Sequence, residues 1–175
     1  LYSLRENRIV LPSSEADPAV RARDSASTAW DLGFRGTSII VNGGISGPGV
    51  GAAQVLPEAF DQVVKAPADG YAADGENECP GVETPAGTFP GAPLAVCNGS
   101  GNGWYVYTPQ TNLVTPIAGR TLVVRTAEDG SYAKVRILSY YQGRPADPDP
   151  FEDTSRYYSF EYVYRPGGSD DLSSN

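Results

Sequence analysis

The stretch SRYYSFEYVYRP, residues 155–166, decides the fold class of this chain. Its residues alternate in type from one position to the next. One set is aromatic and consists of Tyr158, Phe160, Tyr162 and Tyr164. The set on the opposite side consists of Ser159, Glu161, Val163 and Arg165. A period of two with β-favouring aromatics is typical of a strand, and Pro166 ends the run. We therefore expect this segment to lie inside a β-sheet with its aromatic face toward the core.

Related patterns occur on the N-terminal side of this strand. GWYVYTP, residues 103–109, alternates in the same way. RTLVVRTAEDGSYAKVRILSYY, residues 120–141, predicts two strands joined around AEDG, because Asp-Gly supports the positive φ of a hairpin turn. LYSLRENRIVL, residues 1–11, alternates loosely and indicates a first strand. The chain is therefore expected to be all-β and mostly antiparallel, as a sandwich or an open barrel with long loops.

The segment AWDLGFRGTSIIV, residues 29–41, predicts either a strand pair or one long bent strand. Gly33 and Gly36 are expected at bulges or at points where other chain segments approach closely. Trp30 is in phase with the apolar positions that follow it, so we expect it to be a core anchor. Asp31 should then point the other way and accept hydrogen bonds from backbone amides of a turn.

Few segments favour a helix. VLPEAFDQVV, residues 55–64, is the only stretch that tolerates a short one, and a strand carrying Val55 competes with it. Residues 13–28 are polar and are expected to be a connector. Residues 66–103 form a long loop, which in a compact domain is usually functional or cross-linked. Residues 166–175 are expected to be a frayed tail.

The glycine-rich stretch NGGISGPGVGAA, residues 42–53, raises the possibility of a phosphate-binding loop. Such a loop requires a strand before it and a helix after it, and in its commonest form a Lys followed by Ser or Thr. This stretch contains no lysine, and Pro48 lacks a backbone amide. The surrounding pattern is one of antiparallel strands. We therefore expect a wide turn rather than a nucleotide site.

Composition excludes several classes of function. The formal net charge is −8 with 13 basic and 21 acidic side chains, which argues against binding the phosphate backbone of a nucleic acid. No apolar run is long enough for a membrane-spanning helix. The sequence contains no histidine and no methionine, so a Ser-His-Asp or Cys-His catalytic group and a histidine metal site are not available.

The two cysteines, Cys79 and Cys97, are 18 positions apart and lack the paired spacing of a zinc site. We expect them to form a disulfide across the Pro- and Gly-rich loop, with two reduced, separately buried thiols as the alternative. Closing such a loop would stabilise the fold by roughly 3 kcal/mol. A disulfide implies an oxidising compartment.

Three stretches together resemble the HmuY family of surface lipoproteins from Bacteroidetes-type bacteria. They are WDLGFRGTSIIVNGG (30–44), YAKVRILSYY (132–141) and SRYYSFEYVY (155–164), in this order and rough spacing. The resemblance runs from about Leu1 to Arg165 and favours a single domain over residues 1–175. It implies an all-β fold, export, and attachment to the outer membrane through a lipid anchor not present in this chain. The expected place is the outer-membrane surface, the periplasm or the medium. The resemblance also implies haem capture for a TonB-dependent outer-membrane receptor.

One departure from the family concerns the iron. Characterised members hold haem iron with axial His or Met side chains, and this sequence has neither. Tyrosine is another haem ligand, and a loop between strands commonly carries binding groups. The ligand-pocket candidates are therefore Tyr105, Tyr107, Asn112, Tyr140 and Tyr141. The structural alternative is that these tyrosines are ordinary sheet and core residues.

The acidic stretch DPDPFED, residues 147–153, gathers carboxylates that are candidates for a calcium site. These candidates are Asp147, Asp149, Glu152 and Asp153. Their spacing is not that of an EF-hand loop, and two intervening residues are prolines. A solvated acidic turn is the alternative.

Two functions from different classes remain open. The first is an exported, non-enzymatic binding protein whose ligand is haem, a porphyrin or another flat apolar molecule. The second is a structural or accessory cell-surface protein that keeps the scaffold without haem ligation and acts through protein–protein contacts. An enzyme is the weakest hypothesis, because no spacing of carboxylates indicates a catalytic pair.

Overall fold

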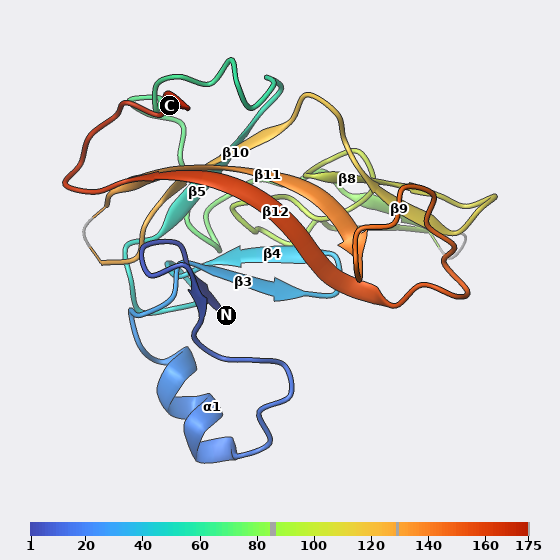
Figure 1. Cartoon of the computed structure of the whole chain (residues 1–175), viewed down its shortest axis with the longest axis horizontal. Coiled ribbons are helices and arrows are strands. Elements are labelled where there is room, and N and C mark those ends of the chain that lie inside the picture. The colour runs from blue at the N-terminus through green and yellow to red at the C-terminus, as the bar shows by residue number, and fades with distance from the viewer. Residues whose placement is uncertain (85–86, 129, 175) are drawn as a thin grey trace.

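The computed structural model describes residues 1–84, 87–128 and 130–174. Two four-stranded antiparallel sheets dominate it, with strand orders β2-β1-β3-β4 and β12-β11-β10-β5. Two separate hairpins, β6-β7 and β8-β9, complete the strands. The long strands β11 and β12 arch over β3 and β4 in Figure 1, and the helix α1 projects away from both sheets. The all-β, mainly antiparallel class is confirmed, with the arrangement of a sandwich.

The elements in chain order are β1 (Tyr2–Ser3), β2 (Arg8–Ile9), α1 (Pro18–Ser25), β3 (Leu32–Arg35), β4 (Ser38–Val41), β5 (Ala52–Leu56), β6 (Val82–Thr84), β7 (Gly87–Phe89), β8 (Tyr105–Thr108), β9 (Leu113–Pro116), β10 (Thr121–Arg125), β11 (Tyr132–Tyr141) and β12 (Ser155–Arg165).

The strand expected over residues 155–166 is β12, and it pairs along its length with β11. Its four alternating aromatics pack against the main core. Phe160 meets the ring of Tyr2 from β1 at 5.1 Å between centroids, and Tyr158 meets the ring of Phe34 from β3 at 4.5 Å. The aromatic face of β12 therefore joins the two sheets, as the period of two predicts.

The hairpin between β10 and β11 is also confirmed. Gly130 has a φ of +64° in its turn, while the neighbouring aspartate, residue 129, lies outside the described residues. Segment 29–41 is a strand pair rather than one bent strand, because β3 and β4 pair in antiparallel register. Gly36 turns this hairpin with a φ of +56°. At Gly33 a Cβ atom would lie 2.7 Å from the side chain of Ile40, so the expected close approach is present.

Trp30 and Asp31 behave as expected at the start of β3. Trp30 is 1% exposed and Asp31 is 6% exposed. The Asp31 carboxylate accepts hydrogen bonds from the backbone amides of Leu4 and Ala127, at 2.8 and 3.0 Å. Burial raises the pKa of Asp31, and these amides act in the opposite direction. One carboxylate therefore connects the N-terminal segment to the end of β10.

The glycine-rich stretch 42–53 forms a turn. Gly43 and Val50 make an antiparallel bridge across it. Asn42 is fully buried, and its side-chain amide donates to the carbonyls of Ser27 and Trp30 while its oxygen accepts from the amide of Gly49. The amides of Ile45, Gly49 and Val50 all donate to acceptors within the protein. The loop is therefore a turn, and these amides do not form an open anion cradle.

The expected helix over residues 55–64 is wrong. Residues up to Leu56 belong to β5, where Val55 pairs with Leu122 of β10, so the competing strand is the correct assignment there. The one helix lies in the segment expected to be a connector. Asp17 caps it by accepting a hydrogen bond from the amide of Ala19, and Pro18 occupies its first turn. None of its residues is buried, so no apolar periodicity marks it in the sequence.

The C-terminal segment also differs from expectation. Instead of fraying, it returns to the outer face of the sheet β12-β11-β10-β5 (Figure 1). There Asp171 forms an antiparallel bridge with Lys65. Leu172 is 0% exposed and packs with Val63, Ala66 and Val123. Its amide donates to the carbonyl of Val64 at 2.8 Å. The tail therefore helps to cover a second, smaller core.

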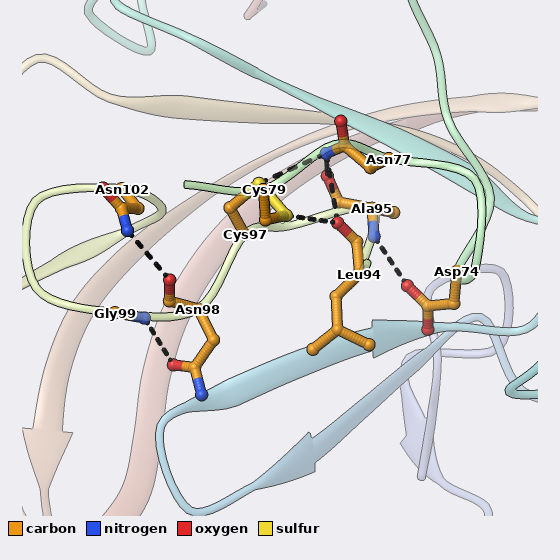
Figure 2. Close-up of a disulfide and its surroundings, with 9 residues drawn as sticks. All are labelled: Asp74, Asn77, Cys79, Leu94, Ala95, Cys97, Asn98, Gly99 and Asn102. Carbon is orange, nitrogen blue, oxygen red and sulfur yellow. Dashed lines mark hydrogen bonds between the residues drawn. A yellow bond between two sulfur atoms is a disulfide. The ribbon is translucent and has the colours of Figure 1, made fainter. Parts of the chain in front are cut away.

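The predicted disulfide between Cys79 and Cys97 is confirmed, with the two Cα atoms 5.3 Å apart. Figure 2 shows how the loop around it is attached. Asp74 is fully buried, and its carboxylate accepts from the amides of Ala95 and Val41. The side-chain amide of Asn77 donates to the carbonyls of Leu94 and Ala95. The long loop 66–103 is thereby tied to β4 as well as closed on itself.

Candidate ligand groove

One face of the molecule carries a groove of about 630 Å³. It lies where the N-terminal segment, the β3–β4 hairpin and the start of β12 meet. Its lining consists of Leu1, Tyr2, Ile9, Leu11, Pro12, Ser13, Phe34, Gly36, Ser155, Arg156, Tyr157, Tyr158 and Phe160. Three segments that are far apart in the sequence therefore build one surface.

The floor of the groove is aromatic. Phe34 and Phe160 are stacked with centroids 5.5 Å apart, and Tyr2 meets Phe160 edge-on. These rings come from three different strands and are held by the core behind them. Ile9 on the neighbouring wall is 62% exposed, which is high for a large apolar side chain in a folded protein. The surface is thus suited to a flat apolar molecule laid against rings.

The other end of the groove is polar and conformationally unusual. Arg156, the second residue of β12, has a φ of +70°, a value that L residues rarely adopt. The pairing of β11 with β12 shifts register twice nearby, between Ile137 and Ser139 and between Ser139 and Tyr141. Such irregularities reorient side chains at the end of a strand. Here the chain turns Arg156 and Tyr157 into the groove.

The phenol groups of the groove differ in hydrogen bonding and in exposure to solvent. Tyr158 donates to the carbonyl of Gly36 at 2.8 Å, and burial raises its pKa strongly. Tyr2 donates to the side-chain oxygen of Asn7. Tyr157 is 51% exposed. The phenol of Tyr158 therefore stays protonated at neutral pH, so it does not offer a tyrosinate oxygen.

One family of known proteins matches most of the chain. The family model described as HmuY protein matches residues 1–162. This chain belongs to the HmuY family. No curated protein matches the chain. HmuY proteins are exported binding proteins of the surface rather than enzymes. In the described part of the chain, no helix is long and apolar enough to span a membrane.

The five tyrosine and asparagine candidates lie outside the groove of this HmuY-family protein. Tyr105 is buried in the core, and its hydroxyl donates to the side chain of Asn98. Tyr107 donates to the side-chain oxygen of Asn112 at 2.8 Å, and both lie at the exposed β8–β9 hairpin. This pair is a local contact across the hairpin.

Tyr140 and Tyr141, the other two candidates, are buried on β11 at 6% and 3% exposure. The hydroxyl oxygen of Tyr141 accepts a hydrogen bond from the amide of Val114. Tyr140 comes closest to the groove, because its ring lies 5.5 Å from that of Tyr158. Burial raises the pKa of Tyr140, and the positive charge of Arg156 acts in the opposite direction. Tyr140 therefore contacts the lining of the groove, and Tyr141 packs against Tyr140 in the core.

The acidic loop does not gather its carboxylates into a cluster. Asp149 accepts a hydrogen bond from the amide of Phe151, and Asp153 accepts one from the amide of Asp149. Across the described residues there is no group of three or more metal-ligating side chains, and this includes Asp147 and Glu152. The carboxylates of Asp149 and Asp153 organise the turn, which is the alternative interpretation of this stretch.

Sequence reasoning missed the residues that line the groove. The alternation of β12 identifies Tyr158 and Phe160, but only as core residues. Arg156 and Tyr157, at the start of the same strand, interrupt the alternation with two large side chains in succession. That break is the local signal that the strand begins at the groove.

Proposed function

We propose that this HmuY-family protein is a non-enzymatic binding protein that holds a flat apolar small molecule, haem or another porphyrin among them, in the groove. The observation that carries the proposal is the groove itself. Its volume of about 630 Å³ falls within the usual range of about 300–1,000 Å³ for small-molecule sites. Its floor of stacked rings matches a planar ligand.

The residues of the groove fit the macrocycle of haem better than its iron. The sequence has no histidine or methionine, and both cysteines are in the disulfide. Among the groove phenols, Tyr158 is held protonated by burial. Affinity must then come from apolar contact, at on the order of 25 cal/mol per Å² buried, less the cost of association. We expect micromolar binding that hardly distinguishes haem from an iron-free porphyrin.

The setting we propose follows from the family. The protein would work outside the cytoplasm, at the outer-membrane surface, in the periplasm or in the medium, where its disulfide is stable. A TonB-dependent outer-membrane receptor is the partner we propose for delivery of the ligand.

Parallel titrations with haemin and protoporphyrin IX, followed by absorbance and by quenching of protein fluorescence, test the proposal. Both should bind saturably with dissociation constants within about threefold of each other. Ile9→Glu places a charge on the exposed wall of the groove and should weaken both at least tenfold. Ile45→Glu is the matched control, because Ile45 is 75% exposed and does not line the groove.

Two results would contradict the proposal. One is the absence of saturable binding of either compound to the wild-type protein. The other is equal weakening by Ile9→Glu and Ile45→Glu, which would place the ligand elsewhere. A nanomolar preference for haemin with a low-spin, six-coordinate spectrum would contradict the expectation about iron. Tyr157 would then be the first ligand to substitute, followed by Tyr105, Tyr107 and Tyr141.

A further inference from the structure

We propose that the groove selects ligands that carry a carboxylate beside their flat apolar body, and that Arg156 is the residue that binds this group. The proposal rests on the function proposed above, since it names the chemical class of ligand for the same groove. It adds a specificity-determining residue that apolar contact alone would not require.

The first argument is that Arg156 has no carboxylate partner among the described residues. Acidic side chains outnumber basic ones by 21 to 13 in this protein. The ion pairs of the described part of the chain use other cations, namely Arg5, Arg8, Arg23, Lys65 and Arg136. Arg156 instead lines the groove, where it is exposed and its side chain donates a hydrogen bond to the phenol of Tyr140.

The second argument is the polarity of the lining. Arg156 is the only basic side chain among the described residues that line the groove, and none of them is acidic. Ser13 and Ser155 add hydroxyl groups to the same lining. The net charge of −8 repels anions from most of the surface. A single basic side chain beside aromatic rings therefore marks where an anionic group can be neutralised.

The third argument is that the backbone positions Arg156 and gives up local stability to do so. A non-glycine residue at a φ of +70° costs on the order of 1–3 kcal/mol. Arg156 is exposed, and its guanidinium also donates a hydrogen bond to the phenol of the buried Tyr140. An arginine held in this way loses less freedom when it binds an anion.

The chemistry of the guanidinium selects a carboxylate in particular. Its planar fork matches the two oxygens of a carboxylate in a bidentate pair. A phosphate dianion would require further cations or a nest of amides, and the described lining supplies only one basic side chain. The matching ligand is a monocarboxylate, or a molecule that presents one carboxylate at a time, with a flat hydrocarbon or aromatic body.

The experiment compares two fluorescent probes, 1-pyrenebutyric acid and 1-pyrenebutanol. Both have the same flat apolar ring system, and only the first carries a carboxylate at pH 7.5. The wild-type protein should bind the acid at least tenfold more tightly than the alcohol. Arg156→Asn should abolish that preference and leave the affinity for the alcohol within twofold. Asparagine tolerates positive φ, so this variant preserves the turn.

Two further variants sharpen the assignment. Arg156→Lys keeps the charge without the fork and should retain only part of the preference. Arg144→Asn is the matched control, because Arg144 also has a positive φ, of 53°, is exposed, and does not line the groove. It should leave the preference unchanged.

The outcomes separate the two proposals. Equal binding of both probes by the wild-type protein would overturn carboxylate selection while supporting the apolar groove. Loss of the preference in Arg144→Asn as well as in Arg156→Asn would overturn the assignment to Arg156 and indicate a diffuse electrostatic effect. Failure of both probes to bind would contradict the proposed function itself.

Discussion

The two faces of the sheet β12-β11-β10-β5 are covered by different means. The inner face is covered by another sheet. There Val135 and Ile137 of β11, with the aromatics of β12, pack against Tyr2 and Phe34. Part of the outer face is covered by a loop and by the C-terminal tail. There Val123 of β10 packs in the second core. Val123 is paired with Lys134 of β11, so the two side chains lie on the same face of the sheet.

The outer face depends on a buried lysine. Lys134 is 0% exposed, and its ammonium group donates to the carbonyls of Phe60 and Val63 at 2.8 and 3.0 Å. The same nitrogen lies 4.3 Å from the centre of the Phe60 ring. Burial lowers the pKa of Lys134. The loop that follows β5 is thus held to the sheet because its backbone carbonyls accept hydrogen bonds from Lys134. No second sheet of the described residues packs on it there.

This difference shows that one sheet can be covered by two kinds of interaction. Apolar packing between sheets follows the alternation of strands and does not depend on any single hydrogen bond. A loop without regular structure has free carbonyls, and a buried cation can satisfy two of them at once. The two faces should therefore respond differently to substitution.

The largest effect should come from the inner face. Phe160→Asp places a carboxylate among rings that join the sheets, so the free energy of unfolding should fall by about 3–5 kcal/mol. Urea denaturation followed by circular dichroism measures it. Phe151→Asp is the matched control, since Phe151 is 82% exposed, and it should change stability by less than about 0.5 kcal/mol. An unchanged midpoint for Phe160→Asp would refute the inner-face packing.

A smaller loss is expected on the outer face. Lys134→Met removes two charge-assisted hydrogen bonds but also relieves the desolvation of a buried charge, leaving a net loss of about 1–2 kcal/mol. Hydrogen exchange should speed up in residues 57–66 and stay slow in β12. Lys65→Met, at a side chain that is 72% exposed, should alter neither quantity. Faster exchange across both faces would show that the faces are not independent.

The smallest effect should appear only in alkali. Burial raises the pKa of Tyr162 to about 12, above the ordinary value of 10.0. The unfolded chain then loses this proton at lower pH than the folded protein. Stability from this group is complete below pH 10 and is lost as the pH rises toward 12. Tyr162→Phe should match the wild type near pH 7 and lose less stability in this range. Parallel profiles of stability against pH would show that the phenol of Tyr162 is not shielded from water.

Much of the fold was predictable because its cause is local. A strand with one buried face must alternate, so β12 and the β10–β11 pair are visible in the order of residues alone. Trp30 and Asp31 obey the same period on opposite sides. The disulfide follows from two lone cysteines that flank a loop rich in turn residues. Each of these predictions depends on neighbours along the chain.

The helix and the tail were not predictable in that way. The residues of α1 bury nothing, so no apolar period marks the helix, and its cap at Asp17 resembles any polar turn. The tail is polar apart from Leu172, and only the second core makes that leucine a buried residue. The residues around Lys134 in the sequence do not indicate that it is buried, because its two hydrogen-bond acceptors are backbone carbonyls about 70 positions away.

By itself, the sequence determined the all-β class, the main strands, the disulfide and the absence of histidine and methionine ligands for iron. Membership of the HmuY family follows from residues 1–162. Only the tertiary structure decided the groove in which we propose that a ligand lies. The groove takes its walls from residues 1–13, 34–36 and 155–160, and it exists only where they meet. Alternation along a strand records which side chains face inward, but a cavity depends on how far apart the opposing segments are held, and that distance is set by the packing of the whole molecule.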